Sequence, residues 1–83
     1  AGAATPPETL TALAIDPSLM VRTAVVGNRR APAEALALLA ADAEQQIRLL
    51  VAKRRDAPHE VLSALTRDAS WRVRRAATTG LRR

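Results

Sequence analysis

The sequence predicts an all-α fold, a helical-repeat solenoid built from three 26-residue repeats of two short helices each. Identical residues recur every 26 positions, apolar positions keep the same register, and proline or aspartate marks two helix starts in each period. A fixed period of this size is typical of solenoids, in which each repeat buries its apolar face against its neighbours. The recurring residues are Pro6, Pro32 and Pro58; Glu8, Glu34 and Glu60; Leu10, Leu36 and Leu62; Asp16, Asp42 and Asp68; Arg22, Arg48 and Arg74.

The period also predicts the domain organisation. Residues 1–4 form an N-terminal tail, and residues 5–83 form a single repeat domain with repeats at 5–30, 31–56 and 57–82. A chain of 83 residues has room for one domain only. With Trp71 as its one aromatic residue, the core is expected to consist of leucine, valine, isoleucine and alanine.

The first helix of each repeat is predicted to begin at its proline, because the first helical turn leaves its N–H groups without partners anyway. Thr5 precedes Glu8 by three residues, which is the spacing of a capping box. The recurring glutamate complements the helix dipole in the first turn. Leucines three residues apart then form an apolar stripe: Leu10 and Leu13, Leu36 and Leu39, Leu62 and Leu65.

The second helix of each repeat is predicted to be capped by the recurring aspartate, a favoured N-cap residue. Pro17 follows Asp16 at a position that suits the first helical residue, and Gln45 follows Asp42 at capping-box spacing. Apolar side chains at i, i+3 and i+4 predict one buried face. They are Val21, Ala24 and Val25; Ile47, Leu50 and Val51; Val73, Ala76 and Ala77.

Turns are expected at Gly27-Asn28, at Lys53-Arg54 and at Gly80, where the repeats close. Two helices and two turns are tight for 26 residues, since familiar two-helix repeats need about 33–47. We therefore expect the second helix to be only one or two turns long, or 3₁₀ in part.

Composition excludes several classes of function. The chain has no cysteine, so disulfides, thiolate metal sites and cysteine nucleophiles are absent, and one histidine does not build a metal site. No apolar run approaches the roughly 20 residues of a membrane span, and the N-terminus does not resemble a signal peptide. No glycine-rich phosphate loop or catalytic constellation stands out. We expect a cytoplasmic protein that is not an enzyme and holds no cofactor or metal.

The pattern A-P-x-E-x-L-x-x-L-x-x-D-x-x-x-x-(V/I)-R, complete from Ala57 to Arg74, resembles the bacterial leucine-rich repeat variant. The resemblance covers residues 5–83 and recurs in all three repeats. It implies a right-handed superhelix of alternating α and 3₁₀ helices. The Asp-x₅-Arg spacing is also similar to HEAT-like repeats, in which that pair links neighbouring repeats. The resemblance implies no catalytic residue and no particular class of partner.

The recurring arginines have two interpretations. Each lies six residues after a recurring aspartate, which favours a ladder of Asp–Arg contacts stacked along the array. The alternative is a stripe of positive charge along one groove, because Arg22 and Arg29, like Arg48 and Arg55, are two helical turns apart. Leu81 takes the corresponding position after Arg74 and interrupts that stripe.

Positive charge is concentrated in the third repeat. The net charge is +5 overall, with +1 over residues 1–30, 0 over 31–56 and +4 over 57–83. A basic patch favours nucleic acid, an anionic lipid surface or an acidic protein as partner. The candidate partner-binding residues are those that do not recur or that fall in turns: Arg29, Arg30, Lys53, Arg54, Arg55, Trp71, Arg72 and Arg75.

Trp71 has two readings that the sequence leaves open. Its column holds Leu19 and Gln45 in the other repeats, so it is unlike a tightly packed core position. With Arg72 and Arg75 beside it, Trp71 would anchor a protein interface or stack on a base. Alternatively, it covers the open end of the array. For the turn arginines, the competing reading is ordinary solvated charge.

The function predicted from these observations is a non-catalytic scaffold for protein–protein interaction, within a longer protein or in an array whose ends self-associate. The alternative is nucleic-acid binding through the arginines of the third repeat. A purely structural spacer would bind neither. Steep salt dependence would distinguish phosphate binding from an interface anchored by Trp71.

Overall fold

The computed structural model describes residues 5–83, which form six α-helices and no β-strand. The all-α prediction is therefore confirmed, whereas the predicted tail at residues 1–4 lies outside the described residues. The helices are α1 (Pro7–Leu13), α2 (Leu19–Gly27), α3 (Ala33–Leu39), α4 (Gln45–Lys53), α5 (His59–Leu65) and α6 (Trp71–Leu81).

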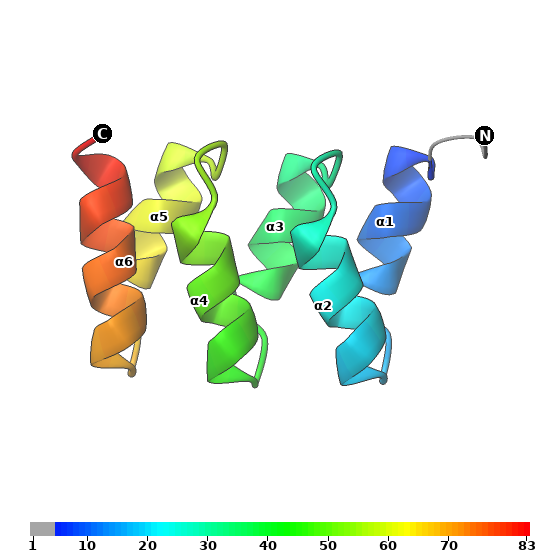
Figure 1. Cartoon of the computed structure of the whole chain (residues 1–83), viewed down its shortest axis with the longest axis horizontal. Coiled ribbons are helices and arrows are strands. Elements are labelled where there is room, and N and C mark those ends of the chain that lie inside the picture. The colour runs from blue at the N-terminus through cyan, green and yellow to red at the C-terminus, as the bar shows by residue number, and fades with distance from the viewer. Residues whose placement is uncertain (1–4) are drawn as a thin grey trace.

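The helices stand in two rows along the longest axis of the molecule (Figure 1). One row holds α1, α3 and α5, and the other holds α2, α4 and α6. Along the second row, α2 packs against α4 and α4 packs against α6. Consecutive helices also pack in pairs, α1 with α2, α3 with α4 and α5 with α6. The resulting body measures 37 × 26 × 18 Å.

The core lies between the two rows and is filled by the recurring apolar positions. Leu36 and Leu39 of α3 meet Ile47 and Val51 of α4 there, and all four are almost completely buried. Most equivalents in the outer pairs are buried as well, such as Leu65 and Val25, although Leu13 and Val21 are only partly buried and Ala77 is smaller. Burial of these aliphatic side chains, each contributing about 1.5–3 kcal/mol, is the main term that holds the rows together.

The first helix of each pair begins one residue later than the sequence predicts. The recurring prolines are N-caps with extended backbone, and none of these caps has a side-chain hydrogen bond. The capping box proposed for Thr5 and Glu8 is therefore wrong. The recurring glutamate does lie in the first turn of each of these helices, so its predicted position is confirmed. Its negative charge there is favourable to the helix dipole.

The second helix of each pair is not capped by the recurring aspartate. Ser18, Glu44 and Ser70 are the N-caps, two residues after that aspartate. The aspartate instead accepts a hydrogen bond from the N–H of the N-cap residue; Asp42, for example, accepts from Glu44 at 2.9 Å. This Asx turn reverses the chain before the helix begins. The capping box proposed for Asp42 and Gln45 is also wrong, because a different residue is the N-cap.

The second helices are α-helical throughout and longer than the first, which contradicts the expectation of short or 3₁₀ segments. They have nine, nine and eleven residues, against seven in each first helix. A second helix of this length fits within 26 residues because the first helix and the aspartate turn are both short. Gly80 does not close a turn, since α6 runs through it to Leu81. A Cβ on Gly80 would lie 3.2 Å from the Leu62 Cδ1 atom, so glycine permits close packing there.

Candidate basic groove between α4 and α6

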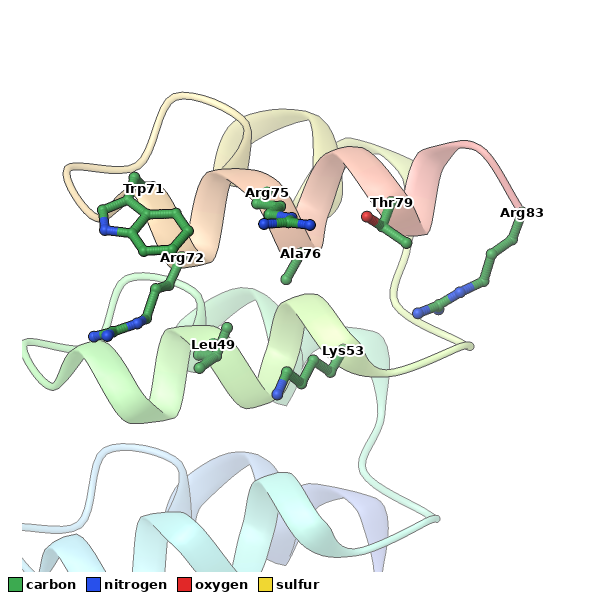
Figure 2. A pocket seen from close by; sticks show the side chains of 8 residues that line it. All are labelled: Leu49, Lys53, Trp71, Arg72, Arg75, Ala76, Thr79 and Arg83. Atoms are coloured by element: carbon green, nitrogen blue, oxygen red, sulfur yellow. The ribbon is translucent and has the colours of Figure 1, made fainter.

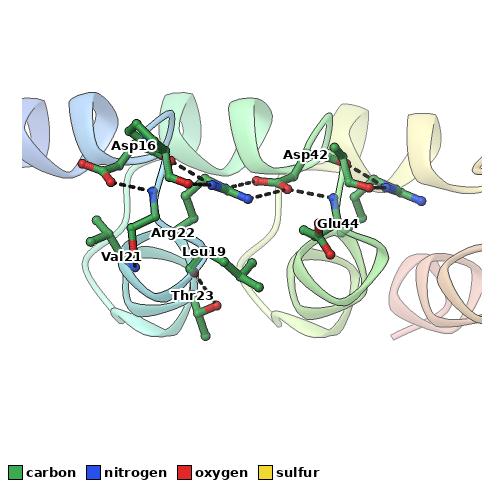
Figure 3. Close-up of polar contacts among 11 residues, drawn as sticks. Asp16, Leu19, Val21, Arg22, Thr23, Asp42 and Glu44 are labelled. Carbon is green, nitrogen blue, oxygen red and sulfur yellow. Dashed lines mark hydrogen bonds and ion pairs between the residues drawn. The ribbon is translucent and has the colours of Figure 1, made fainter.

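A ladder of Asp–Arg contacts joins neighbouring helix pairs (Figure 3). The Arg22 guanidinium donates to Asp42 at 2.7 Å through Nε, and Arg48 donates to Asp68 in the same way at 2.8 Å. Each arginine also donates to the carbonyl of the aspartate six residues before it, at 2.8 Å for Arg22. The interpretation that Arg22 and Arg48 form Asp–Arg contacts along the array is confirmed, and both guanidinium groups are already paired with carboxylates.

The ladder carboxylates are largely withdrawn from water, with 5% of the Asp42 side chain and 8% of the Asp68 side chain exposed. Burial raises the pKa of Asp68, but the hydrogen bonds from Arg48 and the Ser70 N–H, together with the positive charges of Arg48 and Arg74, lower it further than burial raises it. The pKa of Asp68 therefore lies below its ordinary value of 3.8. A charged, paired carboxylate at each junction fixes the register between helix pairs.

Arg54, one of the candidate partner-binding residues, makes its contacts within the chain. Its side chain is only 12% exposed and donates to the carbonyls of Val26 at 2.9 Å and Asn28 at 2.8 Å. It also forms an ion pair with Asp56 at 2.8 Å, and its hydrogen bond lowers the pKa of that carboxyl. Arg54 thus holds the α4–α5 turn to the α2–α3 turn, and its charge is already matched.

Four of the candidate residues are brought together in one groove between α4 and α6, with a volume of about 570 Å³ (Figure 2). Lys53 comes from α4, and Trp71, Arg72 and Arg75 come from α6. Leu49 and Ala76 point toward one another between the two helices and form an apolar floor (Figure 2). Thr79 and Arg83 complete the lining toward the end of α6.

The spacing of residues in α6 explains how its side chains reach one groove. Trp71, Arg75 and Thr79 are four residues apart in α6, so they form one line along the face of the helix. Arg83 follows the end of the helix. Across from them, Leu49 and Lys53 are four apart on α4, which packs against α6.

The groove is strongly electropositive. Its lining contains four cationic side chains and no carboxylate: Lys53, Arg72, Arg75 and Arg83. None of the four forms an ion pair with a described residue, in contrast to the arginines of the ladder. Arg72 lies over the Trp71 ring with its guanidinium carbon 5.4 Å from the ring centroid, a cation–π geometry. A groove lined by charges of one sign attracts ions of the opposite sign, so this groove favours an anion.

Trp71 itself is 57% exposed. Its exposed ring beside unpaired cations gives the groove both an apolar contact surface and positive charge.

The remaining candidates lie elsewhere. Arg29 and Arg55 line a separate groove of about 540 Å³ that also includes Arg54 and Asp56. Arg30 is exposed and lines neither groove. Asp56 partly offsets the charge of this second groove, so it is less electropositive than the groove between α4 and α6.

Sequence reasoning missed Leu49, Ala76, Thr79 and Arg83. The i, i+4 spacing from Trp71 is a signal that identifies Thr79, whereas Arg83 lies beyond the end of α6. No comparable signal identifies Leu49, because its place opposite Ala76 depends on how α4 and α6 pack.

No arrangement for metal or membrane chemistry appears in the described part of the chain. Within residues 5–83, histidine and acidic side chains form no cluster able to ligate a metal ion. Over the same range, every helix falls short of the length and apolarity needed to cross a membrane.

Comparison with protein-family models, with curated proteins and with solved structures finds no match to this chain.

Proposed function

We propose that this chain is a three-repeat solenoid of the leucine-rich repeat variant type and serves as a non-catalytic scaffold that binds an acidic segment of a protein partner. The helix starts at 26-residue intervals and the Asp–Arg contacts between successive pairs support the repeat arrangement. The right-handed superhelix belongs to the same proposal, because it follows from the sequence resemblance.

The observation that carries the proposal is the groove between α4 and α6. Four unpaired cations surround an apolar floor and a half-exposed indole, with no carboxylate in the lining. An acidic peptide with one large apolar side chain matches both properties. Its carboxylates would pair with the arginines, and its apolar side chain would cover Leu49 and Trp71. Tryptophan and arginine are also the residue types most enriched at the energetic centres of protein interfaces.

Tryptophan fluorescence provides a direct test, because Trp71 is the only aromatic residue and therefore reports on this groove alone. The probe is a tryptophan-free peptide of glutamate and leucine, titrated into the chain. We expect saturable binding that changes the emission of Trp71. A matched peptide with glutamine in place of glutamate should bind at least about tenfold more weakly, since it loses the charge-assisted hydrogen bonds.

Variants locate the binding. Arg72→Gln with Arg75→Gln should abolish the fluorescence change, whereas Arg29→Gln with Arg30→Gln removes the same charge outside the groove and should leave it unchanged. For Trp71→Ala, calorimetry should show a loss of about 2 kcal/mol or more in binding free energy. Equal binding of the glutamate and glutamine peptides, or equal effects of the two double variants, would contradict the proposal.

Nucleic acid is the second candidate, and the exposed indole beside Arg72 is the observation that favours it. A base could stack on Trp71 while phosphates contact the cations. In a titration with oligothymidylate, the logarithm of the affinity should then fall with the logarithm of salt concentration with a slope of about −3, if all four cations contact phosphates. Peptide binding without oligonucleotide binding would reject this candidate and support the first.

A further inference from the structure

The Asp–Arg ladder has an unmatched cation in the last helix pair. Arg74 donates through Nη1 to the carbonyls of Asp68 at 2.8 Å and Ala69 at 3.0 Å. Arg48 makes the same two contacts, to Asp42 at 2.7 Å and Ala43 at 3.1 Å, and then binds Asp68 through its other nitrogens. The Arg74 side chain thus makes the same backbone contacts as that of Arg48, but no described carboxylate forms an ion pair with it.

The first helix pair holds the complementary anion. Asp16 accepts a hydrogen bond from the N–H of Ser18 at 2.8 Å, as Asp42 does from Glu44 at 2.9 Å. Asp42 also receives the guanidinium of Arg22, whereas no described cation pairs with Asp16. Both halves of one further ladder contact are therefore present and already oriented. They belong to the α1–α2 and α5–α6 pairs, which lie at opposite ends of the molecule (Figure 1).

Apolar positions near Asp16 are also incompletely covered. Leu13 and Val21 are partly exposed, whereas Leu39 and Ile47 at the same positions of the next pair are fully buried. The face of the first helix pair thus exposes apolar side chains whose equivalents are covered in the next pair.

We propose that two copies of this chain associate head to tail, with Arg74 of one copy paired to Asp16 of the next. The contact reproduces the Arg22–Asp42 and Arg48–Asp68 junctions between molecules. It joins two different faces, so it does not close on itself, and further copies add in the same direction to form an open chain. The surface is distinct from the groove between α4 and α6, so this proposal does not depend on the proposed function.

The residues at the two faces set the strength of the contact. Thr9 and Thr78 occupy positions that are apolar and buried in the other helix pairs. A junction between copies is therefore less apolar than those within the chain, and the +5 net charge of each copy opposes it. We expect weak, concentration-dependent association rather than a permanent assembly.

Sedimentation velocity of the purified chain from about 10 µM to about 1 mM tests the proposal. The apparent mass should rise with concentration. Asp16→Asn keeps the acceptor for Ser18 but removes the charge, and Arg74→Gln removes the guanidinium. Each variant alone should self-associate at least about tenfold more weakly than the original chain, as judged by its dissociation constant. An equimolar mixture of the two variants retains one intact contact and should form dimers and nothing larger.

Arg75→Gln is the matched control, because it removes a neighbouring positive charge that lies in the groove and not in the ladder. It should self-associate like the original chain while losing the peptide binding proposed above, and Arg74→Gln should do the reverse. A chain that stays monomeric throughout the range would overturn the inference. So would unchanged association of both Asp16→Asn and Arg74→Gln, or a mixture of them that stays monomeric.

Discussion

Replacing Arg48 with methionine tests the energetic role of the ladder, since methionine keeps an apolar stem and removes the guanidinium. The substitution deletes two hydrogen bonds to Asp68, at 2.8 and 3.2 Å, and two to the carbonyls of Asp42 and Ala43. It leaves the Asp68 carboxylate, 8% exposed, with only the Ser70 N–H as a partner. Breaking a buried pair in this way costs about 3–5 kcal/mol.

We expect the free energy of unfolding to fall by about 3 kcal/mol. This is the lower end of that range, because water still reaches part of the Arg48 side chain. This loss is a large share of the total free energy of unfolding, which is roughly 4–12 kcal/mol for a chain of this length. Urea unfolding followed by far-UV circular dichroism measures the change. Arg72→Met, on the exposed face of α6, is the matched control and should change stability by less than about 0.5 kcal/mol. A double-mutant cycle with Asp68→Asn should show coupling above about 1 kcal/mol. If Arg48→Met matched the control, or the cycle showed no coupling, the reasoning would be refuted.

Three further outcomes follow from the same contacts. Because the pKa of Asp68 is lowered in the folded state, its stabilising contribution is complete above 3.8 and should be lost as pH falls through its folded pKa, which urea midpoints between about pH 7 and pH 2 would reveal. Arg54→Gln should cost about 2 kcal/mol in the same assay, since it leaves the Val26 carbonyl without its donor; an unchanged midpoint would argue against its role. Gly27→Ala should raise stability by about 0.4–1 kcal/mol, because nothing lies within 4 Å of the added methyl, and a lower melting temperature would contradict this.

The sequence predicted those features that depend on which positions are equivalent. A 26-residue period identifies the columns, so it located two helices per period, the apolar face of each and the Asp–Arg ladder. These features repeat in the same environment, and each column therefore gives the same signal three times.

Features that occur once were harder to predict. Arg54 shares its column with Asn28 and Gly80, so no pattern in the sequence indicates that its side chain reaches back to the preceding turn. The recurring aspartate was assigned as an N-cap from its residue type, but the chain uses it two residues earlier, in an Asx turn. Residue preference alone did not distinguish these two uses, because both employ the same short acceptor.

The groove shows the same division. Periodicity along α6 is enough to align Trp71, Arg75 and Thr79, but Leu49 and Lys53 join them only through the packing of α4 against α6. Likewise, sequence columns marked Trp71 as unusual without deciding between an exposed ring and a cover for the core. In the structure the Trp71 ring is 57% exposed and lines the groove.

The most direct test of the binding groove is a two-dimensional amide and indole NMR spectrum of the chain, recorded as the glutamate–leucine peptide is added. The single indole N–H signal belongs to Trp71, so the site has its own reporter. We predict that this signal shifts together with the amides of Leu49, Lys53, Arg72 and Ala76, while those of Arg29 and Arg30 remain in place. A stationary indole signal, or shifts centred on the α2–α3 turn, would contradict the account.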